Sequence, residues 1–207
     1  MVSGGDFVEG IYFYWISWLG WIITTFFMRK CRERTVLSFV ILVVIAVSDV
    51  TFQAENVTLR TAFIILLLFS FVLMAKTKSF SLFYYLISSL IISIGYGCFH
   101  LFELFDPVWL IIDRKWMLAF IVLYLTLMLA KDYYYRMTIA IIGFCNGELL
   151  YSLILYKFSF AVELGDFPFL DALAVSLLLL SFWSLLEKLS LVFEANFQKG
   201  KARRVLR

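Results

Sequence analysis

Apolar residues occur along the chain in long runs separated by short polar segments, and this spacing is the main structural signal in the sequence. A helix needs about 20 residues to cross about 30 Å of hydrocarbon. Seven runs approach that length, at 7–28, 35–54, 60–75, 80–104, 108–130, 137–158 and 169–193. They lack the alternating polarity of outer-membrane barrel strands. The pattern therefore predicts an all-α, polytopic bundle of seven transmembrane helices, formed by a single domain over residues 1–207.

The composition excludes a water-soluble protein. Hydrophobic residues make up 63% of the chain and charged residues 16%, whereas soluble domains average about 45–50% and about 25%. The net charge is only +3, and binding to nucleic acid needs a concentrated basic face. We therefore expect membrane lipids, and not nucleic acid, to surround the protein.

The distribution of basic residues predicts the orientation. With the N-terminus outside, four Lys and Arg residues lie on the outer side, namely Arg60, Arg114, Lys115 and Lys157. Fourteen lie on the inner side, namely Arg29, Lys30, Arg32, Arg34, Lys76, Lys78, Lys131, Arg136, Lys188, Lys199, Lys201, Arg203, Arg204 and Arg207. Because basic segments remain in the cytoplasm, we predict an outside N-terminus and a cytoplasmic C-terminus. Residues 197–207 form a basic tail that we expect to contact anionic lipid.

The two prolines mark expected helix starts. Asp106-Pro107 precedes the fifth predicted span, and Asp166-Phe167-Pro168 precedes the seventh. An Asp cap followed by Pro in the first turn begins a helix without losing a needed N–H donor.

Glu148 is the main candidate for a functional residue, because it lies midway along the sixth predicted span. An ionisable side chain at the bilayer centre costs about 2.5–3.5 kcal/mol on insertion scales. No Lys or Arg is expected at this depth, so the carboxyl should be neutral or hydrogen-bonded. One hypothesis is a proton- or cation-linked site that includes Asn146. The other, which we favour at this point, is a structural hydrogen bond to Ser181 or Tyr124 on a neighbouring helix.

His100 and Glu103 are three residues apart, so they share one face near the outer end of the fourth predicted helix. Such a pair could bind a metal or relay protons. The chain has no second His. We therefore expect an interfacial hydrogen-bonding pair and no metal site.

Small residues predict close helix packing at two places. Gly143 and Gly147 form a GxxxG motif, and Ser89, Ser93 and Gly97 recur every four residues. Small residues at this spacing let helices approach closely in lipid. Packing within one chain is the favoured interpretation, because the helices must pack in any case, and contact between chains remains open.

No catalytic signature occurs in the sequence. Nucleophile elbows, zinc-protease helices, phosphate loops and paired intramembrane aspartates are all missing. The cysteines, Cys31, Cys98 and Cys145, have neither metal-ligand nor disulfide spacing. We expect a protein that is not an enzyme and has no cofactor.

Several segments together resemble one family. They are Glu9-Gly10-Ile11-Tyr12-Phe13-Tyr14-Trp15 leading into Trp18 to Trp21, Ile94-Gly95-Tyr96, Phe102-Glu103 with Asp106-Pro107-Val108-Trp109, and Gly147-Glu148-Leu149-Leu150-Tyr151. On these segments the chain resembles the small multi-pass membrane proteins of Bacillus called the YphA family. The resemblance implies a multi-pass protein of the bacterial plasma membrane and no particular activity.

Two functional hypotheses remain from the sequence. The first is a non-enzymatic interaction or assembly protein that contacts itself or another membrane protein through its small-residue faces. The alternative is a small proton- or cation-linked transporter or channel that uses Glu148. A closed bundle favours the first hypothesis, whereas a polar cavity that reaches Glu148 favours the second.

Overall fold

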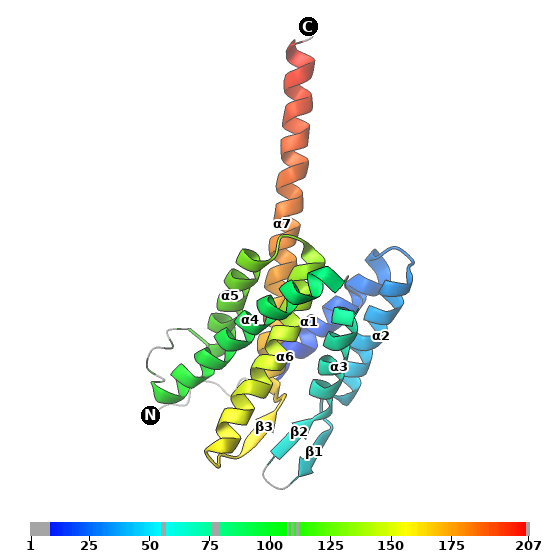
Figure 1. The fold of residues 1–207 in the computed structure, drawn as a ribbon. Helices are drawn as coiled ribbons and strands as arrows, with labels where there is room; N and C mark the ends of the chain where they lie inside the picture. Colours follow the sequence, from blue (N-terminus) through cyan, green and yellow to red (C-terminus); the bar gives the residue numbers. More distant parts are fainter. Residues whose placement is uncertain are drawn as a thin grey trace.

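The computed structural model describes residues 9–54, 57–75, 79–106, 108, 110 and 112–205. Over these residues the chain folds into a bundle of α-helices with one small sheet (Figure 1). The helices are α1 (Ile11–Ile22), continued by a π-helical turn η1 (Ile23–Phe27), α2 (Arg32–Val47), α3 (Thr61–Ala75), α4 (Ser79–Phe105), α5 (Arg114–Leu129), α6 (Tyr133–Lys157) and α7 (Phe167–Val205). The strands are β1 (Thr51–Ala54), β2 (Val57–Arg60) and β3 (Val162–Leu164).

The bundle has two ends that differ in their connections. At one end, here called the sheet end, β1 pairs antiparallel with β2, and β2 pairs parallel with β3. The last residue of α4, Phe105, and the first residue of α5, Arg114, mark the ends of these two helices that lie at the sheet end as well (Figure 1). The opposite end, here called the tail end, holds the connections 28–31 and 130–132, and α7 projects from it (Figure 1). Successive helices therefore run in alternating directions between the two ends.

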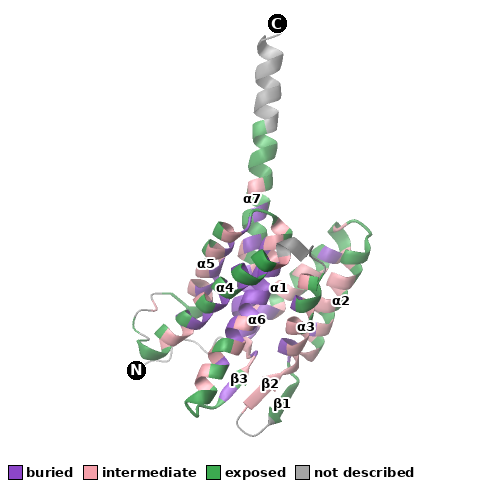
Figure 2. Cartoon of the chain, in the orientation of Figure 1, coloured by how far each residue is buried: buried purple, intermediate pink, exposed green. Residues whose placement is uncertain are grey.

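The core is centred on α6, which is purple over most of its middle in Figure 2. Ile139, Phe144 and Cys145 have no exposed surface. On α4, Ile92 is also fully covered, and Tyr96 is 2% exposed. A Cβ atom at Gly143 would lie 2.5 Å from the Cγ2 atom of Ile92. The helices α4 and α6 therefore approach closely, because a hydrogen replaces a side chain at the crossing.

Two polar contacts fasten α7 to the other helices. The Asp171 carboxylate accepts hydrogen bonds from the backbone N–H groups of Gly10, at 3.1 Å, and Phe13, at 2.7 Å. It thereby caps the N-terminus of α1 from another helix. Toward the tail end, the buried Arg136 guanidinium donates to both Glu187 carboxylate oxygens, at 2.7 and 3.1 Å. The indole of Trp183 also donates to Glu187, at 2.8 Å.

Two predicted spans have boundaries that differ clearly from those of the helices in the structure. The second span was predicted to reach residue 54, but α2 ends at Val47 and 51–54 is a strand. The Arg60 side chain donates to the Ser48 carbonyl at 2.9 Å, just after the end of α2. The backbone N–H and C=O groups of β1 form hydrogen bonds with β2 in place of the bonds of a longer helix. The fifth span was predicted from residue 108, but α5 begins at Arg114 after Asp113. Asp106 is therefore not its cap, and Pro107 lies outside the described residues.

Most of the predicted basic tail is helical, because α7 continues without interruption past the predicted end of the seventh span, residue 193, to Val205. The residues after 193 are mostly Ala, Glu, Gln, Lys and Arg, with no Pro. These residue types favour helix, so nothing in this sequence stops α7 at the end of its apolar run. Its start agrees with the prediction, since Asp166 accepts a hydrogen bond from the Phe169 N–H at 2.8 Å.

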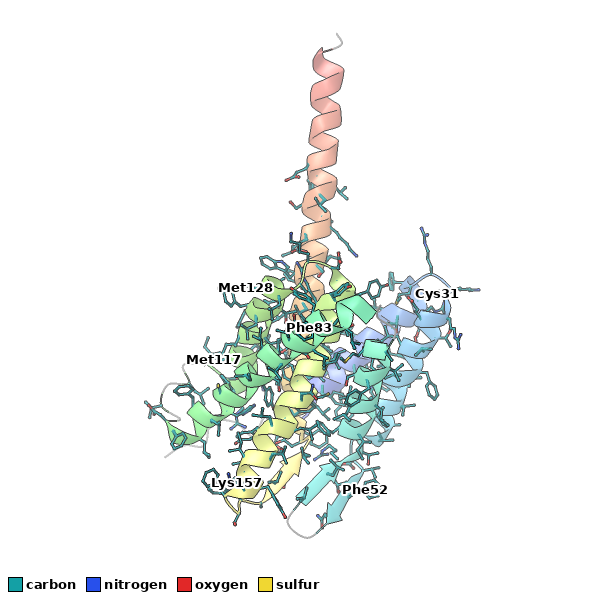
Figure 3. All side chains as sticks on the ribbon, in the orientation of Figure 1. Cys31, Phe52, Phe83, Met117, Met128 and Lys157 are labelled. Carbon is teal, nitrogen blue, oxygen red and sulfur yellow. The ribbon has the colours of Figure 1, made fainter. Side chains whose placement is uncertain are left out.

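The outer surface is rich in apolar side chains. In Figure 3, Met128 lies at the outer edge of the bundle, and the exposed fractions of Phe83 and Met128 are 71% and 69%. Within the described residues, three helical segments are long and apolar enough to cross a membrane, namely Leu82–Phe105, Tyr133–Lys157 and Phe167–Glu194. Two shorter helical segments, Ile11–Phe27 and Thr61–Ala75, are apolar as well.

Candidate functional site

A cavity of about 540 Å³ lies at the sheet end of the bundle, between α4, α5, α6, α7 and the segment that contains β3. Its polar or aromatic lining residues are Tyr96, His100, Glu103, Arg114, Glu148, Tyr151, Glu163, Asp166 and Phe169. Its other lining residues are Leu104, Leu118, Leu155, Ala161, Pro168 and Ala172. The volume lies within the range of about 300–1,000 Å³ that is usual for small-molecule sites.

Glu148 is the most deeply buried carboxyl group of the cavity, with 4% of its surface exposed. One carboxylate oxygen accepts a hydrogen bond from the Tyr96 hydroxyl at 2.6 Å, and the other accepts from the Gly165 N–H at 3.3 Å. The sequence-based prediction of a hydrogen bond to Ser181 or Tyr124 is therefore wrong. Ser181 donates to the Leu177 carbonyl of its own helix, and Tyr124 is 64% exposed.

The backbone position from which Gly165 donates to Glu148 requires a glycine. Its φ angle is +72°, and a Cβ atom would lie 2.3 Å from the Cβ atom of Phe63. Only glycine combines a left-handed backbone with such a close approach. The turn after β3 thereby brings a backbone N–H to the Glu148 carboxylate.

His100, Glu103 and Arg114 form a polar cluster along one wall of the cavity. The His100 Nδ1 atom lies 3.4 Å from Glu103, and the Arg114 Nε atom lies 2.5 Å from the same carboxylate. The His100 Nε2 atom is buried and has no hydrogen-bond partner within the described part of the chain. The His100 ring packs against Tyr96, with ring centroids 4.5 Å apart, and against Tyr151, at 5.1 Å.

Helical spacing explains how α4 supplies this wall. Tyr96, His100 and Glu103 are separated by four and three residues, so they lie on one face of the helix. Tyr96 meets Glu148 toward the bundle interior, and Glu103 meets Arg114 farther along the wall. The polar face of α4 therefore connects the buried Glu148 of α6 with the partly exposed Arg114 of α5.

Asp166 and Glu163 complete the acidic lining from the segment before α7. Burial raises the pKa of Asp166, and the hydrogen bond from the Phe169 N–H opposes this rise. The sequence predicted Asp166 only as a helix cap and gave no role to Glu163, Arg114 or Tyr96. The sequence did contain a signal for this acidic lining, since ionisable residues lie in and next to the predicted outer loops.

The other candidate residues lie elsewhere. Asn146 is partly buried and is not part of the cavity lining. Gly147 packs on the Tyr96 side chain, and Gly97 packs on Leu150. Ser89 and Ser93 are buried on the same helix as Gly97. The small residues of α4 and α6 thus contribute to contacts within one chain.

The cavity lacks the geometry of a metal centre. Within the described residues, no three His, Cys, Asp or Glu side chains are grouped closely enough to hold a metal ion. His100, Glu103 and Glu148 line the same space without converging on one point. The arrangement can bind a solute through carboxylates and aromatic rings, and it can hold a proton at Glu148 or Asp166.

The fold and the cavity define a helical integral membrane protein with a polar, acidic cavity at one end of its bundle. The chain belongs to the YphA-like integral membrane protein family, whose sequence model matches residues 9–205. It is similar to the protein named "Uncharacterized protein YphA" of Bacillus subtilis (strain 168), with 29% identity over 175 residues, 84% of this chain and 86% of that relative. No solved structure matches the chain. The family resemblance seen in the sequence is confirmed.

Proposed function

We propose that this protein is a small carrier for a cationic solute, in which Glu148 binds either the solute or a proton. The observation that supports the proposal is the polar cavity that reaches the buried Glu148. A closed, dry bundle would have favoured the assembly hypothesis. An ionisable residue inside a membrane protein that faces a cavity marks a solute or ion pathway in many transporters.

The proposed topology has seven spans, with the N-terminus outside and the C-terminus in the cytoplasm. The alternating helix directions support it, as do the basic residues near the tail end, which include Arg29, Lys30 and Lys131. Basic segments remain in the cytoplasm, so in this orientation the cavity opens to the outside of the plasma membrane.

In the proposed transport cycle, the Glu148 carboxyl group binds either a proton or the cation, and never both at once. A cation entering from outside is attracted by ionised Glu148, and its arrival favours loss of the proton. In the empty protein, the proton neutralises a carboxyl group that would otherwise be a buried charge without a basic partner. Tyr96 donates its hydroxyl hydrogen to Glu148 at 2.6 Å and stabilises the ionised form. Exchange of a proton for a cation therefore needs no second titrating site.

Reconstituted protein tests this function directly. Proteoliposomes with an internal pH indicator should show proton movement when an organic cation is added outside. Glu148→Gln should abolish the movement because the amide cannot ionise. The matched control is Glu194→Gln, a change on the exposed part of α7 away from the cavity. Equal proton movement in wild type and Glu148→Gln, or none in wild type with any cation, would refute the carrier.

The assembly hypothesis remains a second candidate because of one specific feature. Beyond the Arg136–Glu187 contact, residues 188–194 of α7 are all exposed, including Leu189, Leu191 and Phe193. An apolar helix segment at the edge of the membrane could contact a second copy or another membrane protein. Cross-linking in cells from a cysteine placed at residue 191 should then give a defined adduct. Recovery of monomer alone would exclude this function.

A further inference from the structure

The class of solute follows from the lining of the cavity, and this inference rests on the proposed carrier function. A divalent metal ion needs several oxygen or nitrogen ligands that converge within about 2.0–2.6 Å. No such group exists in the described residues. The cavity volume of about 540 Å³ is also far larger than a bare ion needs. The lining therefore favours an organic solute.

The charges of the cavity favour a cation. Four carboxyl groups line it, from Glu103, Glu148, Glu163 and Asp166, against the single guanidinium of Arg114. That guanidinium is already bonded to Glu103. In the described structure, the other three carboxyl groups form no ion pair with Lys or Arg. When these carboxyl groups are ionised, the cavity has an excess of negative charge that an incoming cation would balance.

The aromatic side chains favour an organic cation in particular. Tyr96, Tyr151 and Phe169 line the cavity together with the His100 ring. Tyr96 and Phe169 lie edge to face, with ring centroids 6.5 Å apart, and Tyr151 packs beside His100. Faces of such rings attract an ammonium group and also cover an adjoining hydrocarbon chain. An inorganic ion would use only the first of these properties.

The hydrogen-bonding atoms of the lining indicate which class of organic cation fits the cavity. The lining presents more acceptors than donors, because each carboxylate oxygen can accept two hydrogen bonds. Glu148 accepts one hydrogen bond at each oxygen, and Asp166 accepts one from Phe169. A primary or secondary ammonium donates N–H groups that would use the remaining lone pairs. A quaternary ammonium has no N–H group and would leave these acceptors unpaired.

We propose that the solute is a protonated primary or secondary amine with an apolar group, bound with its ammonium at Glu148 and Asp166 and its apolar part against Tyr151 and Phe169. Leu155 and Ala172 provide additional apolar surface in the cavity wall.

Three probes of similar shape test the proposal. Benzylamine carries an ammonium, benzyl alcohol is its uncharged counterpart, and benzyltrimethylammonium keeps the charge without an N–H group. Binding to the full-length protein in lipid nanodiscs is measured by calorimetry, with empty nanodiscs subtracted to remove partitioning into lipid. We expect benzylamine to bind about tenfold or more tightly than either of the other probes, because charged hydrogen bonds exceed 1.4 kcal/mol, the equivalent of tenfold.

Two variants locate the binding. Glu148→Gln and Asp166→Asn each remove one charge, and each keeps a carbonyl oxygen for the Tyr96 or Phe169 donor. Both should weaken benzylamine binding about tenfold, while Glu194→Gln should leave it unchanged. Tight binding of benzyl alcohol, equal binding of the quaternary probe, no effect of either variant, or no binding of any probe would overturn the proposal.

The experiment separates this inference from the carrier function. Benzylamine binding without proton movement in proteoliposomes would remove the carrier and keep the amine site. Proton movement driven by Na⁺ or K⁺ without benzylamine binding would keep the carrier and remove the amine site.

Discussion

The bundle has two parts, here called its halves, that differ in how many of their residues are buried. One half consists of α4, α5, α6 and α7, and the other includes α1 and α2. In α6, twelve of 25 residues are buried, and the first part of α7 is buried continuously from Phe169 to Ser176. In contrast, α2 buries one residue of 16, Val44, and α1 buries only Phe13. The cavity belongs to the first half, which α4, α5, α6 and α7 form.

The difference shows what burial achieves in a membrane protein. Exposed apolar side chains on α1 and α2 lose nothing when lipid surrounds them, because lipid tails are as apolar as a protein core. Polar groups such as Glu148 and Arg136 cannot face lipid at acceptable cost. Dense packing therefore concentrates on the helices that enclose polar groups, and the first two helices need only enough contacts to stay attached.

Removal of a large ring should give the largest difference between the two halves. Phe144 is fully buried in α6, whereas Phe39 is 66% exposed on α2. We expect Phe144→Ala to lower the free energy of unfolding by about 3 kcal/mol, the lower end for such changes, because the cavity cost remains in lipid. Phe39→Ala should change it little. Unfolding in mixed micelles by added dodecyl sulfate measures both. Equal losses would contradict the proposed division of the bundle.

Glycine substitution compares the two halves at the backbone. A Cβ atom at Gly147 would lie 2.7 Å from the Tyr96 Cβ atom, whereas at Gly20 the nearest atom, on Ile41, is 3.9 Å away. Gly147→Ala should cost about 1–3 kcal/mol by overpacking, and it should also displace Tyr96 from Glu148. Gly20→Ala should be neutral or stabilising, because alanine favours helix. Thermal unfolding in detergent, with ligand binding as a second measurement, tests the pair. A tolerated Gly147→Ala would show that α4 and α6 can separate freely.

The contact between Arg136 and Glu187 tests whether the denser half also depends on charge. Arg136 is buried, and Glu187 is its carboxylate partner. Glu187→Gln should cost about 1–2 kcal/mol, less than a fully buried pair, because the Glu187 side chain is 43% exposed. Glu194→Gln on the same helix is the control. The dodecyl sulfate titration again provides the measurement, and identical curves for the two variants would show that packing alone holds α7.

A pH series gives the smallest effect and tests the cavity. Burial raises the pKa of Asp166, so this carboxylate becomes neutral at a higher pH than an exposed Asp does. Benzylamine affinity should therefore fall as the pH is lowered through that range. The other titratable and charged groups around the cavity are Glu148, Glu163, Glu103, His100 and Arg114. The Asp166→Asn variant should show a shallower decline in calorimetric titrations. A pH-independent affinity would exclude Asp166 from the site.

The sequence predicted the helices well where hydrophobicity alone decides the structure. The third span, 60–75, matches α3 (Thr61–Ala75) closely. It failed where pairing between distant segments decides. Residues 51–54 follow closely after an apolar run, yet they pair with β2, which in turn pairs with β3, over one hundred residues away. No local pattern contains that partner.

The site was predicted in part for a similar reason. A carboxyl group inside an apolar run is visible in one dimension, so Glu148 could be identified. Its partner depends on the rotation of α4 relative to α6, which the contacts of Gly143 and Gly147 with Ile92 and Tyr96 set. The GxxxG motif predicted a close approach without naming the helix that approaches. Tyr96 was therefore missed.

The length of α7 connects the wall of the cavity with the far end of the helix. At 1.5 Å per residue, its 39 residues extend for about 58 Å, and one continuous helical rod joins Phe169 in the cavity wall to the basic sequence at its far end (Figure 1). A small tilt of such a rod moves its distant tip much farther than its base. In the proposed carrier, a solute that displaced Phe169 would therefore also displace the basic end of α7.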